Sequence, residues 1–367
     1  MPCGPRHGRR PFRRAAPRRN YCRPSGRTEG AADLLQRAAA VGADNALVHY
    51  HRGIALADLN RHSEALESYN RAVALRPDNA KAWNNRGIAL ACLARHDEAL
   101  ESYDAALRVK PDHAEALNNR GVALRDLGRH AEALEAYDRA LRHKPDYVEA
   151  ITNRGTALDA LLRHAEALEA YARALRLAPG YAEAWNNRGV ALAALQRHVE
   201  ALEAYERALA LKPDYAEALN NRGVALAALD RHGEALASYA RALEHKPGYD
   251  FLYGRWLHAR MKVCDWEGIR DDIAKLESKI RRREKATPPF PLLALTASAD
   301  VERIAAEIWF STSIARALDC RVVPRPIGGK SRATRYGSAT FRPTFASMRA
   351  RAFSWASSRG TIGRGSK

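Results

Sequence analysis

Apolar residues in the middle of the chain are spaced as they are on one side of a helix. Between Ala114 and Leu127 the predicted apolar face consists of Ala116, Leu117, Gly121, Leu124 and Leu127. A second face follows, made of Ala133, Leu134, Tyr137, Ala140 and Leu141. Gly128 stands where the first helix should stop, and Pro145 follows the second, because proline cannot continue a helix. The pattern predicts two consecutive helices joined by a short turn.

This two-helix unit recurs along the chain at a fixed interval of 34 residues. Three residue types mark the period: Gly87, Gly121, Gly155, Gly189 and Gly223; Tyr69, Tyr103, Tyr137, Tyr171, Tyr205 and Tyr239; and Pro77, Pro111, Pro145, Pro179, Pro213 and Pro247. A constant period of this length indicates a stacked array, since one unit cannot bury its apolar face alone. We expect Gly121 and Ala133 to let paired helices approach closely, and Tyr137 to fill the remaining gap.

The unit resembles the tetratricopeptide repeat, with Gly at its eighth position, Ala at the twentieth, an aromatic residue at the twenty-fourth, Ala at the twenty-seventh and Pro at the thirty-second. The resemblance implies an all-α, right-handed superhelical solenoid with a concave groove. Six complete repeats span residues 44–247, and residues 29–43 are predicted to be a partial repeat before them. One departure is an arginine where the family has leucine, at Arg86, Arg120, Arg154, Arg188 and Arg222.

A row of asparagines occupies the sixth position of the repeats. It comprises Asn85, Asn119, Asn153, Asn187 and Asn221, with His51 in the first repeat. A side-chain amide both donates and accepts hydrogen bonds, so such a row can grip the backbone of an extended polypeptide of any sequence. We take these five residues as the candidate peptide-binding site. The alternative is a solvated or intra-repeat hydrogen-bonding position copied by duplication. The preceding Asn84, Asn118, Asn186 and Asn220 are expected to be cap or surface residues.

A row of histidines marks the turn inside each repeat: His62, His96, His130, His164, His198 and His232. Imidazole is a good metal ligand. However, packed helices lie about 8–10 Å apart, too far for histidines of neighbouring repeats to share an ion. We therefore expect these side chains to fill the slot at the turn, and predict neither a metal site nor a bound cofactor.

The chain's formal charge of +18 lies in its two ends. Residues 1–28 hold nine Arg and no acid, and residues 321–367 hold nine Arg, two Lys and no acid, which leaves 40 basic and 42 acidic residues between them. We predict a disordered Arg-rich arm over 1–28 and a disordered basic tail over 318–367. The charge is therefore weak evidence for nucleic-acid binding. Five scattered cysteines without a C-x-x-C pair favour a reducing, cytoplasmic location.

Residues 248–317 are predicted to be capping helices and a Pro-rich linker. Here Cys264-Asp265-Trp266, a further helix and Pro289-Phe290-x-Leu292-Leu293 resemble the junction in bacterial protein O-linked N-acetylglucosaminyltransferases. In that family a repeat superhelix with an asparagine ladder delivers protein substrates to a two-lobed catalytic domain that uses UDP-GlcNAc.

The catalytic domain itself does not follow. Two nucleotide-binding lobes need about 300 residues, and the acid-free remainder carries no catalytic motif. Read in a shifted frame, residues 335–346 permit the string Leu-Arg-Leu-Gly-Tyr-Val-Ser-Ala-Asp-Phe-Arg, which is similar to the opening of that catalytic domain. We hypothesise that the tail is transferase DNA read out of frame, and that the chain has no catalytic residues and is inactive alone.

The favoured function is a protein–protein interaction scaffold that binds polypeptide segments of client proteins and takes no small-molecule substrate. The alternative is a stand-alone adaptor whose basic tails bind nucleic acid or an anionic membrane. Dimerisation through the convex side or the array ends stays open.

Overall fold

The computed structural model describes residues 26–41, 44–292, 295–296 and 298–318, and these form helices and no β-strand. The predictions of disorder for the arm and the tail fall almost entirely outside these ranges. A single helix, α1 (Gly26–Val41), lies where the partial repeat is expected, although it begins three residues earlier.

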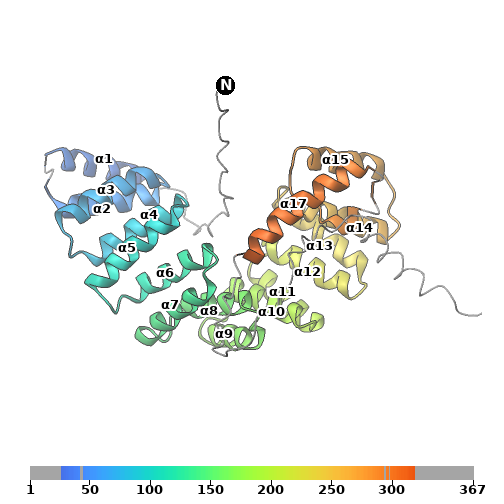
Figure 1. Cartoon of the computed structure of the whole chain (residues 1–367), viewed down its shortest axis with the longest axis horizontal. Helices are drawn as coiled ribbons and strands as arrows, with labels where there is room; N and C mark the ends of the chain where they lie inside the picture. The colour runs from blue at the N-terminus through green and yellow to red at the C-terminus, as the bar shows by residue number, and fades with distance from the viewer. Residues whose placement is uncertain (1–25, 42–43, 293–294, 297, 319–367) are drawn as a thin grey trace, which may run out of the picture. The chain divides into compact units, whose positions relative to one another are not determined.

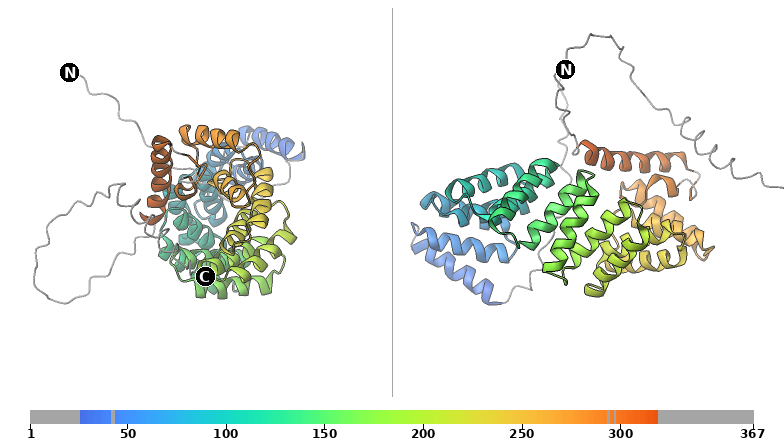
Figure 2. Two further views of the ribbon diagram at one scale, coloured as in Figure 1. Left: turned by 90° about the vertical axis from the view of Figure 1, so that its right-hand side faces the viewer. Right: turned by 90° about the horizontal axis from the view of Figure 1, so that it is seen from below.

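Each of the six repeats consists of two antiparallel helices (Figures 1 and 2). The first helices are α2 (Ala46–Asp58), α4 (Ala80–Cys92), α6 (Ala114–Asp126), α8 (Val148–Ala160), α10 (Ala182–Ala194) and α12 (Ala216–Ala228). The second helices are α3 (His62–Leu75), α5 (His96–Val109), α7 (His130–His143), α9 (His164–Leu177), α11 (His198–Leu211) and α13 (His232–His245). The predicted unit of two helices per 34 residues is therefore confirmed.

The turn between the two helices of a repeat has one conformation throughout. The second residue after the first helix is left-handed, with φ of 76° at Gly128 and between 58° and 61° at its non-glycine equivalents. The second helix then begins with an Arg–Glu pair, in which Nε and Nη2 of Arg129 donate to the Glu132 carboxylate at 2.7 and 2.6 Å. This pair recurs in all six repeats, at the exposed start of every second helix.

Close contact between glycine and tyrosine holds the two helices of a repeat together. A Cβ atom added at Gly155 would lie 2.5 Å from Cε1 of Tyr171, and the same distance recurs at the equivalent glycines. The side chain of Tyr171 is fully buried and belongs to the same core cluster as Ala167. The predicted roles of these glycines and tyrosines in packing are thus observed.

The unexpected arginines of the seventh position connect neighbouring second helices. Arg86 donates to Asn70 of the preceding repeat and to Ser102 of its own repeat, each 16 residues away. Arg120 and Arg154 pair with Asp104 and Asp138 of their preceding repeats, both at 2.7 Å. Because a long polar side chain here finds acceptors on either side, it replaces an apolar contact by a hydrogen-bonded link between repeats.

Four further helices follow the last repeat: α14 (Leu252–Lys262), α15 (Ile269–Arg281), α16 (Pro289–Leu292) and α17 (Ala299–Leu318). They share an apolar core that includes Leu257, Leu276, Ile280 and Val301. Val263, the residue that follows α14, is exposed.

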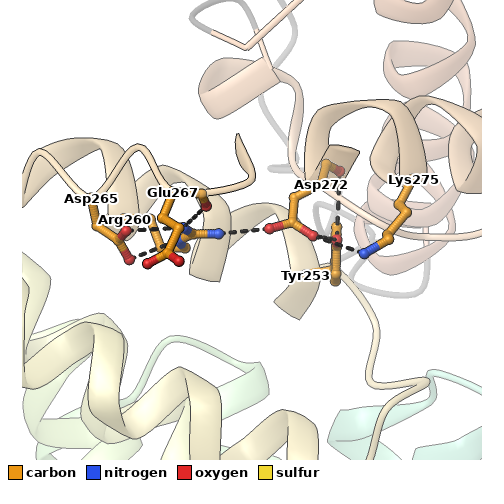
Figure 3. Close-up of polar contacts among 6 residues, drawn as sticks. All are labelled: Tyr253, Arg260, Asp265, Glu267, Asp272 and Lys275. Atoms are coloured by element: carbon orange, nitrogen blue, oxygen red, sulfur yellow. Dashed lines mark hydrogen bonds and ion pairs between the residues drawn. The ribbon is translucent and has the colours of Figure 1, made fainter. Parts of the chain in front are cut away.

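Arg260, on α14, is buried at the centre of a polar network (Figure 3). Its guanidinium donates to both carboxylate oxygens of Asp265 at 2.8 and 2.9 Å, to Asp272 at 2.6 Å and to the backbone carbonyl of Glu267. Its hydrogen bonds to Asp265, and then its charge, hold the pKa of this carboxyl below its usual range. The Asp265 of the Cys-Asp-Trp segment therefore serves the turn from α14 to α15.

Candidate functional site

The first helices form the inner side of the stack. Each first helix contacts the first helix of the next repeat, from α2 to α12, whereas no comparable contact joins neighbouring second helices in the described part of the chain. The first helices therefore lie closer together than the second helices, and the stack bends around them. We call the solvent-facing side of these six helices the inner face.

Three rows of side chains run along the inner face, at the second, sixth and ninth repeat positions. These positions follow one another at intervals of four and three residues, which places them on one side of a helix. The glutamate row is Glu115, Glu149, Glu183 and Glu217; the asparagine row is Asn85, Asn119, Asn153, Asn187 and Asn221; the apolar row is Ile88, Val122, Val190 and Val224, with Thr156 at the equivalent place. The glutamates are exposed and the asparagines are half-buried.

A second row of asparagines lies directly beneath the first. Asn84, Asn118, Asn186 and Asn220 are at most 5% exposed. The expectation that they are cap or surface residues is therefore wrong. The fifth position of the repeat turns toward the neighbouring repeat, so these amides are covered when repeats stack, a contact that the spacing within one repeat does not reveal.

The two asparagine rows are joined by hydrogen bonds into what we call the amide chain. Within a helix, Nδ2 of Asn84 donates to Oδ1 of Asn85 at 3.3 Å. Between helices, Nδ2 of Asn119 donates to Oδ1 of Asn84 at 3.0 Å, and Asn153 donates to Asn118 at the same distance. The donor and acceptor of each link between repeats are 35 residues apart. Pairs of asparagines 35 residues apart, one more than the period, are therefore the signal in the sequence that could have identified the buried row.

The amide chain is divided into two runs, and its two outer ends contact polar side chains other than asparagine. Asn85 donates to the Tyr50 hydroxyl at 3.5 Å at the start of the first run. The runs are separated at Thr152, which stands in the asparagine position and donates instead to the carbonyl of Val148 at 2.9 Å. The second run ends at Arg255, which donates to Oδ1 of Asn220 at 2.8 Å.

Each sixth-position amide retains hydrogen-bonding capacity. A primary amide has two N–H donors and two acceptor lone pairs. In the amide chain, Asn119 uses one N–H toward Asn84 and one lone pair toward Asn118. One donor and one acceptor remain, on a half-buried side chain whose orientation is set by its two neighbours. The predicted peptide-binding residues are thus brought into one line, and each forms at least one hydrogen bond to a neighbouring side chain.

Tyrosines flank the glutamate row. Tyr181, just before α10, donates its hydroxyl to Oε2 of Glu183 at 2.9 Å. Burial raises the pKa of Tyr181 and of Tyr215, and the nearby Glu183 carboxylate raises both further. These phenols therefore stay neutral donors beside the acidic row.

The centre of the inner face departs from the repeat pattern. Arg125 stands where most repeats have alanine, donates to Asp126 at 3.0 Å and to Asn153 at 3.5 Å, and lies between two repeats. In the next repeat Asp159 accepts from the Tyr171 hydroxyl at 2.8 Å, and burial raises the pKa of this carboxyl. These polar groups partner one another, so we assign them to the contact between repeats.

Each histidine of this row is the first residue of a second helix, directly after the turn inside the repeat. Nδ1 of His164 lies 3.0 Å from Oδ1 of Asp159. Within the described ranges, no three His, Cys, Asp or Glu side chains come together as metal ligands would.

The comparisons with known proteins agree with this geometry. Models described as tetratricopeptide repeat match residues 84–148, 182–215 and 200–250, and a model described as TPR repeat matches residues 55–92. The array is built of tetratricopeptide repeats. No curated protein matches the chain.

Several solved structures are similar. The Cut9–Hcn1 hetero-tetramer of APC/C matches with a TM-score of 0.57 and 18% identity. The match covers 64% of this chain and 46%, less than half, of the Cut9–Hcn1 chain. YrrB, described as a TPR protein with an unusual peptide-binding site, matches at 26% identity and a TM-score of 0.42, covering 51% of this chain and 97% of its own. TTC0263, a thermophilic TPR protein of Thermus thermophilus, matches at 29% identity and a TM-score of 0.44, covering 50% and 99%.

The tetratricopeptide array and its capping helices contain no segment suited to crossing a bilayer. Among the residues that the structure describes, every helix is too short or too polar for that role.

Proposed function

We propose that this tetratricopeptide-repeat chain is a protein–protein interaction scaffold that binds extended polypeptide segments of client proteins along its inner face. The observation that carries the proposal is the asparagine row, whose half-buried amides are aligned by the amide chain and each keep a donor and an acceptor. A peptide unit needs one of each, so the row can bind a backbone without regard to its side chains.

Preorganisation supports the same function. Binding a flexible peptide loses conformational freedom, and any side chain that must be ordered at the same time adds about 0.5–1.5 kcal/mol. Because Asn119, Asn153 and Asn221 are already held by hydrogen bonds of 3.0–3.1 Å to the preceding repeat, little of this cost falls on the protein. Neighbouring amides are about 8–10 Å apart, as packed helices are, so an extended client has about three residues per repeat.

Changing Asn119, Asn153 and Asn187 to Ala together tests the proposal. Each substitution removes hydrogen bonds worth about 0.5–1.5 kcal/mol, so the affinity for an extended peptide should fall at least tenfold. The measurement is fluorescence anisotropy with a labelled peptide drawn from a library selected on the full chain.

A matched control changes Glu135, Glu169 and Glu203 to Ala, at exposed second-helix positions of the same three repeats. The control should bind as the unmodified chain does, and the circular dichroism of both variants should report intact helices. Equal affinity in the asparagine variant and the control would remove the row from the binding site.

We also propose that the array descends from the substrate-recognition half of a protein O-linked N-acetylglucosaminyltransferase. The support is the Cys264-Asp265-Trp266 segment at the end of the repeats, together with the asparagine row. The segment proposed to be out of frame lies outside the described residues. Resequencing the DNA around codons 305–335 tests the idea, because stop codons soon after the shift would exclude a continued transferase.

A further inference from the structure

We infer that the clients of the inner face are cationic, with a Lys or Arg side chain at every third residue over the third to sixth repeats. This inference rests on the proposed function and adds the chemistry of the client to it. Its basis is the glutamate row beside the asparagine row.

Three carboxylates of the glutamate row differ in their ion pairing from other glutamates of the array. Glu115, Glu149 and Glu183 are exposed, and none forms an ion pair with a described residue. By contrast, the glutamate at the start of each second helix is held by two arginine nitrogens, as Glu166 is by Arg163 at 2.7 Å. The array therefore neutralises one row of carboxylates internally and leaves Glu115, Glu149 and Glu183 of the inner face open to solvent.

The spacing of the row fits an extended chain. Glutamates of successive repeats are separated by one helix packing distance, about 8–10 Å. A polyproline II segment rises about 3.1 Å per residue with three residues per turn, so its side chains return to the same side every ~9.3 Å. Every third side chain of such a client then faces a glutamate. The asparagine row, which lies between the glutamate row and the apolar row, then runs along the client backbone. The apolar row, where Val190 and Val224 are 40% and 41% exposed, contacts side chains that do not face a glutamate.

The ends of the row limit it to four repeats. Lys81 replaces the glutamate in the second repeat, and Leu47 stands in the first. On the other side Arg255 takes the sixth position after the last repeat and donates to Asn220. At about three client residues per repeat, the acidic stretch between these residues accommodates about twelve client residues and about four cations.

The net charge of the chain opposes the binding of a cationic client, so the attraction must come from charges close to the inner face. The chain carries a formal charge of +18, and a cationic peptide is repelled by the molecule as a whole. Attraction must come from the glutamates within about one Debye length, which is about 8 Å at physiological ionic strength.

The test compares three labelled twelve-residue peptides by fluorescence anisotropy with the full chain. One has Lys at positions 1, 4, 7 and 10, the second has the same composition with the four Lys adjacent, and the third has Gln in place of Lys. The first should bind about tenfold more tightly than either of the others. Equal binding of the two lysine peptides would overturn the inference.

The variant Glu149→Gln with Glu183→Gln should weaken binding of the period-three peptide about fivefold and leave the Gln peptide unchanged. The matched control, Glu135→Gln with Glu169→Gln, makes the same change in net charge on exposed positions of second helices and should alter neither affinity by more than about twofold. Equal effects of the two pairs would also overturn the inference.

Failure of the inference is distinguishable from failure of the proposed function. If all three peptides bind equally and all are weakened by the triple asparagine variant, the scaffold function stands and the cationic preference is wrong. If no peptide binds, both fail. A tenfold rise in affinity on removing residues 1–25, at about 0.3 M salt where long-range repulsion is screened, would assign the face to the chain's own Arg-rich segment and overturn the proposal of a separate client.

Discussion

Replacing Gly155 with alanine should destabilise the array by about 2–3 kcal/mol, despite alanine's higher helix propensity. The added methyl group would lie 2.5 Å from Cε1 and 2.8 Å from Cζ of Tyr171. That ring is fully buried, and its hydroxyl is held by Asp159 at 2.8 Å, so it has little freedom to move away. The helices α8 and α9 must then separate. Urea unfolding of the full chain measures the loss.

The control for this prediction is Gly233→Ala, in a second helix where no atom lies within 4 Å of the added methyl group. Here only the helix propensity changes, so the variant should be more stable by about 0.5–1 kcal/mol. If Gly155→Ala were as stable as Gly233→Ala, the contact between glycine and tyrosine would not be limiting the approach of the paired helices.

Arg260→Ala should destabilise the capping helices by about 2–3 kcal/mol, since it removes several hydrogen bonds between charged groups and leaves the mostly buried Asp272 carboxylate with Lys275 as its remaining ion-pair partner. Arg260 links α14 to Asp272 on α15, whose side chain is only 15% exposed, and to the turn at Asp265 (Figure 3). Its guanidinium also lies 5.2 Å from the centre of the Trp256 ring. Limited proteolysis should show faster cleavage between α14 and α15, and urea unfolding the lower stability.

Arg129→Ala is the matched control, because it removes a fork to Glu132 in which both side chains are nearly half exposed. An exposed pair at this spacing is worth about 0.3–0.5 kcal/mol. Arg260→Lys should fall between the two, since lysine keeps the charge but cannot reach three acceptors with a planar fork. Equal stability of the Arg260→Ala and Arg129→Ala variants would show that the network does not hold the cap.

Two sets of polar contacts explain how the binding face is kept in order. Tetratricopeptide repeats contact mainly their neighbours, so the register of the inner face depends on each junction. Arg86, Arg120 and Arg154 each tie a first helix to the second helix of the preceding repeat, and within each run the amide chain ties one first helix to the next. These hydrogen bonds align the asparagines of each run without closing the face.

The period in the sequence determined most of the fold. Because glycine, tyrosine and proline return every 34 residues, the two helices of each repeat, their turn and their closest contact followed from one unit. The fixed period also put Asn119 and its equivalents in one row, since equal positions in stacked repeats lie on the same face. By contrast, the sequence showed that arginine replaces the family's leucine at the seventh position but did not show what this arginine contacts.

Only the tertiary structure decided what each polar row contacts. Asn118 and Asn119 are adjacent and chemically identical, yet one is buried against the next repeat and the other faces the inner side. Stacking likewise decides the partner of Arg120, which donates to Asp104, 16 residues before it in the preceding repeat. Burial and pairing depend on atoms 16 or 35 residues away, brought together by stacking, whereas the period within a repeat specifies only which residues are equivalent.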